Sequence, residues 1–331
     1  MKKFISLLVG ILLLTTGCGK IGKREVIRDL NKKIQGLKSY YVEGKMEIIN
    51  NEDVYKYDVY VAYKNKDLFK VSLKNESNNH EQIILKNKEG VYVLTPSLNK
   101  SFKFESNWPY NNSQIYLLQS ILSDINNDKA LEFNSKDDSY IITTSVNYPN
   151  NKDLVKQNIY LDKKLNLKQV LVLNSNGNAE IKMIFNKISE NNKFEDDYFD
   201  LKKTMETTKV EEQSIEVSKI DDAIFPMYLP SNTSLKSQNT ISKDNGERLI
   251  LTFAGDKPFV LVEETISKSN ELEIVPTLGE PTILLDTIGS LSENSASWIS
   301  NGIEYYIASD VLSEDELSNI AKSISTIPVM K

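Results

Sequence analysis

The chain has 331 residues, of which 40% are hydrophobic and 26% are charged, and its formal net charge is −6. This is a globular composition with room for one large or two ordinary domains, and it excludes a mainly disordered chain. No run of five or more basic residues occurs, which argues against a nucleic-acid partner. The 33 asparagines supply many turn formers.

The N-terminal residues have the layout of an export signal. Lys2 and Lys3 precede an apolar run from Phe4 to Leu14, which is too short for a membrane-spanning helix of about 20 residues. Gly17-Cys18 follows, and this pair resembles the bacterial lipobox, in which the Cys is acylated and the signal is removed before it. Cys18 is the single cysteine of the sequence, so no disulfide can form within the chain.

We therefore expect residues 1–17 to be a lipoprotein signal peptide, Cys18 to be lipidated and residues 18–23 to be a tether. Acyl chains would then hold the protein on the outer face of the cytoplasmic membrane or of a forespore-derived membrane. The alternative is an ordinary signal peptide with an incidental Cys.

The next segment changes from a helical period to a strand period. Apolar residues spaced three and four apart predict a helix from Arg24 to Leu37. Apolar and polar residues then alternate from Tyr55 to Lys64 and from Phe69 to Lys74, which is typical of antiparallel strands with one solvated face.

The stretch from Ile83 to Ile125 predicts strands at Gln82–Leu85, Val91–Leu94 and Phe102–Phe104. Trp108-Pro109 requires an extended backbone, and the spacing of the apolar residues after it predicts a helix over Ser113–Asp124. Four more strands are expected in series, with a hairpin turn at Asn176-Gly177. They are Ser139–Asn147, Asp153–Asp162, Leu165–Asn174 and Ala179–Ile188.

The order helix, strands, helix, strands predicts an α+β domain over residues 24–201. Two helices can cover only one face of so many strands, so we expect a curved antiparallel half-barrel with an apolar concave face. Ten residues are expected to line this cavity or to form an interface. They are Tyr57, Val59, Val61, Tyr63, Phe69, Val71, Trp108, Ile115, Leu118 and Leu122.

Three segments carry a family resemblance: Val59–Asn75, then NKEGVYVLTPSLNKSFKF and NWPYNNSQIYLL. They resemble the LolA-like lipoproteins of spore-forming Gram-positive bacteria, a branch that contains a sporulation lipoprotein and a clostridial germination lipoprotein. The resemblance covers about Lys32 to Leu201 and implies a LolA/RseB-like half-barrel. It also implies a role in spore formation or germination, with a cortex-modifying N-acetylmuramoyl-L-alanine amidase as partner, as in the clostridial member.

Residues 202–223 are polar and lack a strong period, so we expect a linker, with an edge strand or helix of the first domain as the alternative. A small α+β domain is then expected over residues 224–331, with a hairpin turn at Asn301-Gly302. A capping box at Ser313 to Glu316 predicts a final helix of about twelve residues. The expected strands are Arg248–Ala254, Phe259–Ile266, Ile283–Ile288, Ala296–Ser300 and Glu304–Ala308. Tyr228 to Ile324 resembles the small C-terminal domain of extracytoplasmic Firmicute lipoproteins and anti-sigma-type proteins.

No residue suggests a reaction. His80 is the single histidine and is expected in a solvated turn, so a multi-histidine zinc site is excluded. The acidic clusters Glu195-Asp196-Asp197 and Asp221-Asp222 are expected to be solvated, and Trp108 and Trp298 to be core anchors. No nucleotide-binding, nucleophile-elbow or zinc-protease motif occurs. We expect no catalytic residue, no metal and no cofactor.

These observations favour a non-enzymatic lipoprotein that binds a protein partner through edge strands or a tyrosine-rich face. One alternative is a carrier or sensor of acyl chains or lipoproteins in the concave cavity, which requires an open apolar groove under the Ile115–Ile125 segment. Regulation of an envelope sigma-factor pathway is a further alternative, and an enzyme is the least favoured.

Overall fold

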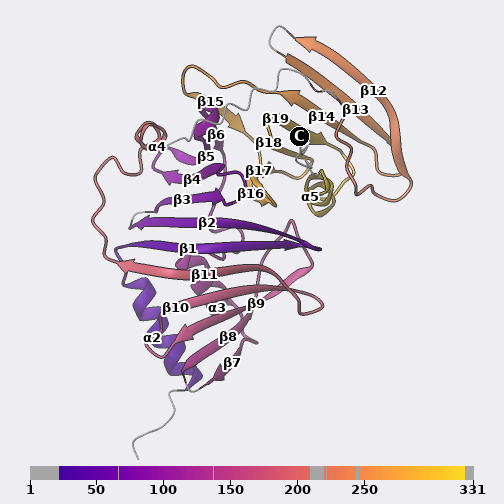
Figure 1. Cartoon of the computed structure of the whole chain (residues 1–331). Coiled ribbons are helices and arrows are strands. Elements are labelled where there is room, and N and C mark those ends of the chain that lie inside the picture. Colours follow the sequence, from indigo (N-terminus) through magenta and orange to yellow (C-terminus); the bar gives the residue numbers. More distant parts are fainter. Residues whose placement is uncertain are drawn as a thin grey trace, which may run out of the picture.

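The computed structural model describes residues 22–65, 67–136, 138–208, 220, 222–243 and 246–324. Over these residues the chain is mostly β with few helices. It forms one open sheet of twelve strands and a second sheet of seven strands (Figure 1). The expected signal peptide, Cys18 and Asp221 lie outside the described residues.

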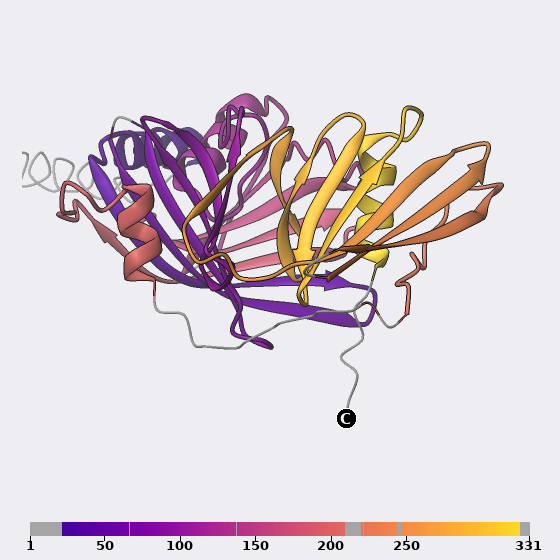
Figure 2. The ribbon, with the colours of Figure 1, turned by 90° about the horizontal axis from the view of Figure 1, so that it is seen from above.

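The large sheet is antiparallel over eleven of its strands, in the order β6-β5-β4-β3-β2-β1-β11-β10-β9-β8-β7. Strands β2 to β6 follow β1 outward in chain order on one side. On the other side β7 to β11 run from the far edge inward, so that β11 pairs with β1. The sheet curves along its length (Figure 2). The strands are β1 (Ser39–Asn50), β2 (Asp53–Lys64), β3 (Leu68–Asn75), β4 (Glu81–Asn87), β5 (Gly90–Thr95), β6 (Lys100–Phe104), β7 (Glu132–Ser135), β8 (Ser139–Ser145), β9 (Leu154–Asp162), β10 (Leu167–Asn174) and β11 (Ala179–Glu190).

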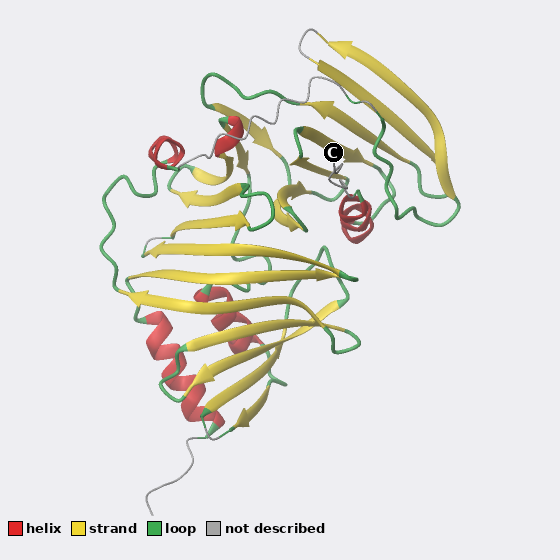
Figure 3. Cartoon of the chain, in the orientation of Figure 1, coloured by secondary structure: helices red, strands yellow, loops and turns green. Residues whose placement is uncertain are grey.

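Helices α2 (Lys23–Gln35) and α3 (Leu118–Asn127) lie on the same face of this sheet (Figure 3). The buried stripe of α2, which includes Leu30, packs with that of α3, which includes Ile121, over strand residues such as Val61. The predicted arrangement of two helices over one face is therefore present.

The opposite face of the large sheet has its own cover. Helix α4 (Leu201–Thr207) follows Asp200, whose side chain caps it by accepting from the backbone N–H of Lys203 at 2.9 Å. Leu201 and Phe199 pack against Ala62 and Leu85 on this face. The start of the predicted linker is thus helical and belongs to the first domain, because its apolar residues have a sheet face to cover.

The second sheet has the order β12-β13-β14-β19-β18-β17-β16. Its strands are β12 (Thr233–Lys243), β13 (Gly246–Gly255), β14 (Phe259–Thr265), β16 (Glu280–Leu284), β17 (Thr287–Leu291), β18 (Ser295–Ser300) and β19 (Ile303–Ala308). The predicted hairpin at Asn301-Gly302 joins β18 to β19, with positive φ at both residues (48° and 79°).

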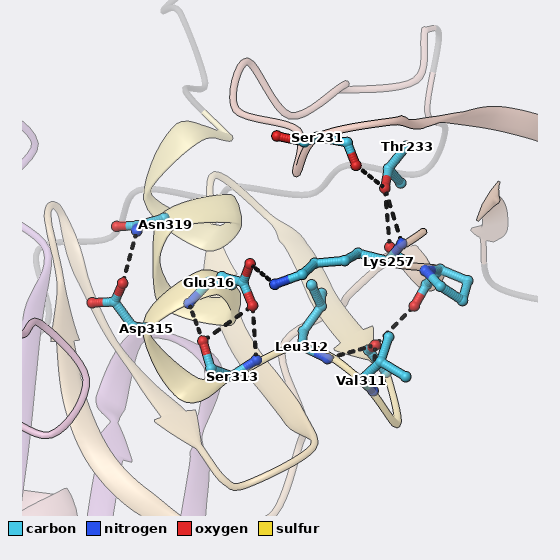
Figure 4. Close-up of polar contacts among 11 residues, drawn as sticks. Ser231, Thr233, Lys257, Val311, Leu312, Ser313, Asp315, Glu316 and Asn319 are labelled. Atoms are coloured by element: carbon cyan, nitrogen blue, oxygen red, sulfur yellow. Dashed lines mark hydrogen bonds and ion pairs between the residues drawn. The ribbon is translucent and has the colours of Figure 1, made fainter. Parts of the chain in front are cut away.

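Helix α5 (Glu314–Ser323) covers one face of this sheet through Leu317 and Ile320. The predicted capping box is confirmed, since Ser313 Oγ accepts from the backbone N–H of Glu316 at 3.3 Å and the Glu316 carboxylate accepts from the backbone N–H of Ser313 at 3.1 Å (Figure 4). Lys257 forms an ion pair with the same carboxylate, which ties the helix start to the turn before β14.

One strand of the second half of the chain joins the first sheet. β15 (Glu273–Thr277) pairs in parallel with β6, in a register that places Glu273 opposite Lys100, and the two side chains form an ion pair at 3.5 Å. β15 therefore covers the edge of β6 and makes the large sheet twelve strands wide.

Several boundaries differ from the prediction for local reasons. The second helix begins at Leu118 instead of Ser113, because the backbone N–H of Ser113 donates to the carbonyl of Asn147 at 2.9 Å and holds that segment extended. The expected strand Ile283–Ile288 is two strands, β16 and β17, with a turn at Leu285-Asp286. Strands β1, β7, β12 and β15 were not predicted.

Candidate functional site

The two sheets are joined by a buried polar contact. The Gln82 side chain on β4 accepts from the backbone N–H of Ile288 at 2.6 Å and from the Thr287 hydroxyl at 3.0 Å, and it donates to the Ile288 carbonyl at 3.2 Å. The Tyr57 hydroxyl donates to the carbonyl of Leu285 at 2.5 Å. These bonds fix β17 and the turn before it against the concave face of the large sheet.

A cleft of about 400 Å³ lies beside this contact, between the two halves of the chain. One side comes from the ends of β1 and β11, the loop before α3 and the turn between β8 and β9. The other side comes from β16, the turn at Leu285 and helix α5. The volume lies in the range of small-molecule sites.

The lining of the cleft combines an apolar base with many amides. Met46, Ile48, Ile115, Leu154 and Ile283 supply apolar surface. Six side-chain amides surround it: Asn50, Asn112, Gln114, Asn150, Asn151 and Asn319. Asp153, Glu180, Asp315 and Lys322 add charges.

Helix α5 supplies one wall of the cleft with three polar side chains on one helical face, Asp315, Asn319 and Lys322. Asn319 donates to Asp315 at 3.4 Å, and the backbone N–H of Lys152 in the first domain donates to the same carboxylate at 3.3 Å (Figure 4 shows Asp315 and Asn319). Burial lowers the pKa of Lys322, although the nearby charges of Asp315 and Glu180 oppose the shift.

A partly buried carboxyl group lies behind the loop that lines the cleft. Asp124 on α3 accepts from the Gln157 side chain at 2.7 Å. Burial raises its pKa to about 6, against the hydrogen bonds from Ser113 and Gln157, which favour the charged form.

The ten residues predicted to line a cavity are placed mostly in the core. Eight are buried and do not line this cleft, and Tyr63 is half-buried; the eight are Tyr57, Val59, Val61, Phe69, Val71, Trp108, Leu118 and Leu122. Ile115 is buried too, but it does line the cleft. The open groove expected under the second helix is instead filled, because the side chains of that helix pack into the sheet.

Sequence reasoning missed the polar residues of the cleft. Asn50, Asn112 and Asn150 read as ordinary turn formers, and in the sequence nothing shows that three turns meet at one place. The partial signal was α5, where Asp315, Asn319 and Lys322 share one face of a helix that the capping box predicted.

The other candidate residues have mixed outcomes. Trp108 and Trp298 are buried, and Trp298 stacks on Tyr305 with ring centroids 5.0 Å apart.

His80 lies in the turn between β3 and β4, but it is not solvated as predicted. Its ring is half-buried, its Nε2 atom has no hydrogen-bond partner within the described residues, and burial lowers its pKa. The acidic run Glu195 to Asp197 is exposed, as predicted.

The tyrosines divide between core and surface. Tyr40, Tyr57, Tyr92 and Tyr116 are buried, whereas Tyr60 and Tyr110 are exposed at 39% and 63%. The Tyr116 hydroxyl donates to Gln114 at 2.6 Å and thereby orients an amide of the cleft.

A second candidate site is strand β12, one of the two end strands of the second sheet. In β12 every residue after Thr233 is exposed, and Leu235 and Ile241 expose 40% and 46% of their surface. β12 pairs only with β13 within the described residues, so the outer side of the strand presents unpaired backbone groups.

Two kinds of feature are absent from the described ranges. No group of three or more His, Cys, Asp or Glu residues there could hold a metal ion. None of the helices in those ranges has both the length and the hydropathy needed to cross a bilayer.

Comparison with known proteins gives one sequence relative and several distant structures. The sporulation protein YdcC of Bacillus subtilis strain 168 is 35% identical over 327 residues, which cover 98% of this chain and 97% of that protein. No family model matches the chain.

Three solved structures illustrate the distant likeness. MucB in complex with MucA(peri) matches with a TM-score of 0.33 and 12% identity over 92% of this chain and 98% of that one. The CwlD amidase from Clostridioides difficile in complex with the GerS lipoprotein matches at 0.28 and 17%, over 54% and 97%. The LolA superfamily protein NE2245 from Nitrosomonas europaea matches at 0.32 and 10%, over 56% and 100%.

These features define a class of protein: a mostly β chain with a large open sheet, a second smaller sheet and a cleft between them. Within that class the sequence relative is decisive. The chain belongs to the family of the sporulation protein YdcC.

Proposed function

We propose that this protein is a lipid-anchored extracytoplasmic lipoprotein of spore formation or germination that binds a protein partner and performs no catalysis. The partner proposed is a cortex amidase, as the sequence resemblance implies. Membership in the YdcC family supports a role in sporulation. The pattern Gly17-Cys18 after an apolar run supports the lipid anchor and the extracytoplasmic location.

The observation that carries the binding proposal is the free edge of β12. An extended segment of a partner can add to such an edge by backbone hydrogen bonds, while the exposed Leu235 and Ile241 give side-chain contacts on the two faces. Proteins that do not use an edge strand usually protect it with charges or cover it. Over the described residues β12 ends its sheet, as do β16 in the same sheet and β15 and β7 in the large sheet, and β12 is the longest of these four edge strands.

The position of β12 suits a partner held above the membrane. Helix α2, which follows the predicted tether, and strand β12 lie at opposite ends of the molecule (Figures 1 and 2). A lipid at Cys18 would therefore leave β12 free to meet another protein.

The test is recovery of the amidase with the full-length chain from sporulating cells. We expect wild type to retain the amidase, the variants Leu235→Lys and Ile241→Lys to lose most of it, and the matched variant Val311→Lys, which changes an exposed apolar residue outside any strand, to retain it. Cys18→Ala should move the chain from the membrane fraction to the soluble fraction.

Two results would overturn the proposal. One is recovery of the amidase in equal amounts with all three lysine variants, which would remove β12 as the docking edge. The other is wild-type chain that recovers no cell-wall enzyme from cells that contain it.

A further inference from the structure

The cleft between the sheets contains a cation that makes no direct polar contact with a described residue. Lys322 is half-buried on α5, and within the described residues its ammonium has no hydrogen-bond acceptor and no carboxylate within 4.0 Å. The carboxylates of Asp315 and Glu180 lie near this charge without contacting it, so they offset its burial only in part. A bound anionic group in direct contact would lower the remaining cost.

The amides of the cleft favour a ligand with hydroxyl and acetamido groups. Each Asn or Gln side chain offers both donors and an acceptor, which is the pairing that such groups need. Asn150 contributes a buried Oδ1 atom that has no hydrogen-bond partner within the described residues. Tyr116 and Gln114 form a hydrogen-bonded chain that ends at Asn112 and so orient these amides.

The remaining lining limits the ligand further. Ile48, Ile115, Leu154 and Ile283 form apolar surface that suits the C–H face of a sugar ring, but an acyl chain would leave the surrounding amides without partners. Three carboxylates, Asp153, Glu180 and Asp315, outnumber the single ammonium of Lys322. They can accept from hydroxyl groups, and they would repel a ligand with several negative charges.

We propose that this cleft binds a saccharide of N-acetylated amino sugars that carries one carboxylate, and that the carboxylate pairs with Lys322. The amides from the turns of the first domain hold the hydroxyl and acetamido groups, and α5 provides the charged end. The inference goes beyond the binding of a protein partner at β12 and does not depend on it.

The experiment compares two disaccharides by calorimetry on the full-length chain in lipid nanodiscs. The probes are N-acetylglucosaminyl-N-acetylmuramic acid, which has a carboxylate, and N,N′-diacetylchitobiose, which has none. We expect millimolar or tighter binding of the first. A charge-assisted hydrogen bond is worth about 10-fold or more in Kd, so Lys322→Met should weaken the first probe by that factor and the second by less than about 2-fold.

Two variants keep this test interpretable. Lys322→Arg retains the charge and should lose less affinity for the acidic disaccharide than Lys322→Met. Lys268→Met removes an exposed lysine in the loop after β14 and should change neither affinity.

The proposal is overturned if neither disaccharide binds wild type at about 5 mM. It is also overturned if Lys322→Met, with an unchanged unfolding temperature, weakens both disaccharides equally or weakens neither. Because no amidase is present, these outcomes are independent of the fate of the β12 proposal.

Discussion

Both the oxygen and the nitrogen of the Gln82 side-chain amide form hydrogen bonds, and these join two sheets that come from distant parts of the chain. Its oxygen accepts from Ile288 and Thr287, and its nitrogen donates to the Ile288 carbonyl and, at 3.4 Å, to Thr95. A buried amide can be tolerated only when its partners are satisfied in this way. From the sequence, Gln82 begins a predicted strand, and nothing there distinguishes it from a solvated residue.

Replacement of this residue should therefore be costly. We expect Gln82→Leu to lower the free energy of unfolding by about 2–4 kcal/mol, because the N–H and C=O of Ile288 would stay buried without partners. Urea denaturation of the variant and wild type measures the difference. Gln238→Leu, at an exposed position of β12, is the control and should change stability by less than about 0.5 kcal/mol. A loss for Gln82→Leu as small as that of the control would contradict this role.

Glu263 should make the second sheet sensitive to pH. Its buried carboxylate accepts from the backbone N–H of Ile224 at 3.0 Å, and burial raises its pKa to about 7 from an ordinary value of 4.5. The folded state therefore holds the proton more tightly than the unfolded state, so this stabilisation is complete below about pH 4.5 and is lost as pH rises through about 7.

We expect Glu263→Gln to reduce the fall in unfolding free energy between about pH 5 and pH 8 by about 1–2 kcal/mol. The unfolding free energy of the variant should still fall as pH rises, since Asp124 in the first domain also has a pKa raised by burial, to about 6. Urea denaturation at several pH values measures this, and the exposed Glu293→Gln should leave the slope unchanged. An unaltered slope in Glu263→Gln would show that this carboxyl does not titrate in that range.

At the scale of elements, the sequence predicted those helices and turns whose positions are determined by residues close together in the chain. The period of α2, the turn residues Asn176-Gly177 and Asn301-Gly302, and the capping box of α5 are local signals, and each marks the element that it predicts. β12 escaped prediction because both of its faces are exposed, so its residues show no alternation. β15 contains Pro276, which argues against a strand, yet a proline is tolerated at a sheet edge.

The capping box also gives a quantitative expectation. Ser313→Ala removes the side chain that accepts from the Glu316 N–H, and the loss of such a cap costs about 0.5–2 kcal/mol of unfolding free energy. Chemical denaturation checks the value. Ser234→Ala on the exposed β12 strand should be neutral. A neutral effect of Ser313→Ala would mean that the ion pair between Lys257 and Glu316 alone fixes the start of the helix.

At the scale of the whole molecule, the sequence separated the chain into two domains, while the structure shows how closely they are joined. The predicted half-barrel residues are buried as a core, and Ile288 of the second sheet packs in that same core. Alternation in a sequence identifies which face of a strand is covered, but not whether a helix, a second domain or a ligand covers it. For that reason the cleft and its amides could not be predicted from the residues alone.

The contacts between the two sheets lead to an expectation for how the protein unfolds. Domains with separate cores commonly unfold in separate steps. Here β15 extends the large sheet, Gln82 bonds to Ile288, and Tyr57 bonds to Leu285, so loss of either half exposes polar and apolar groups of the other. We therefore expect a single calorimetric transition for wild type, with equal calorimetric and van't Hoff enthalpies. The double variant Gln82→Leu/Tyr57→Phe should separate it into two transitions. Two transitions in wild type would show that the contacts between the sheets are too weak to couple them, and the cleft that they frame would then open before either core is lost.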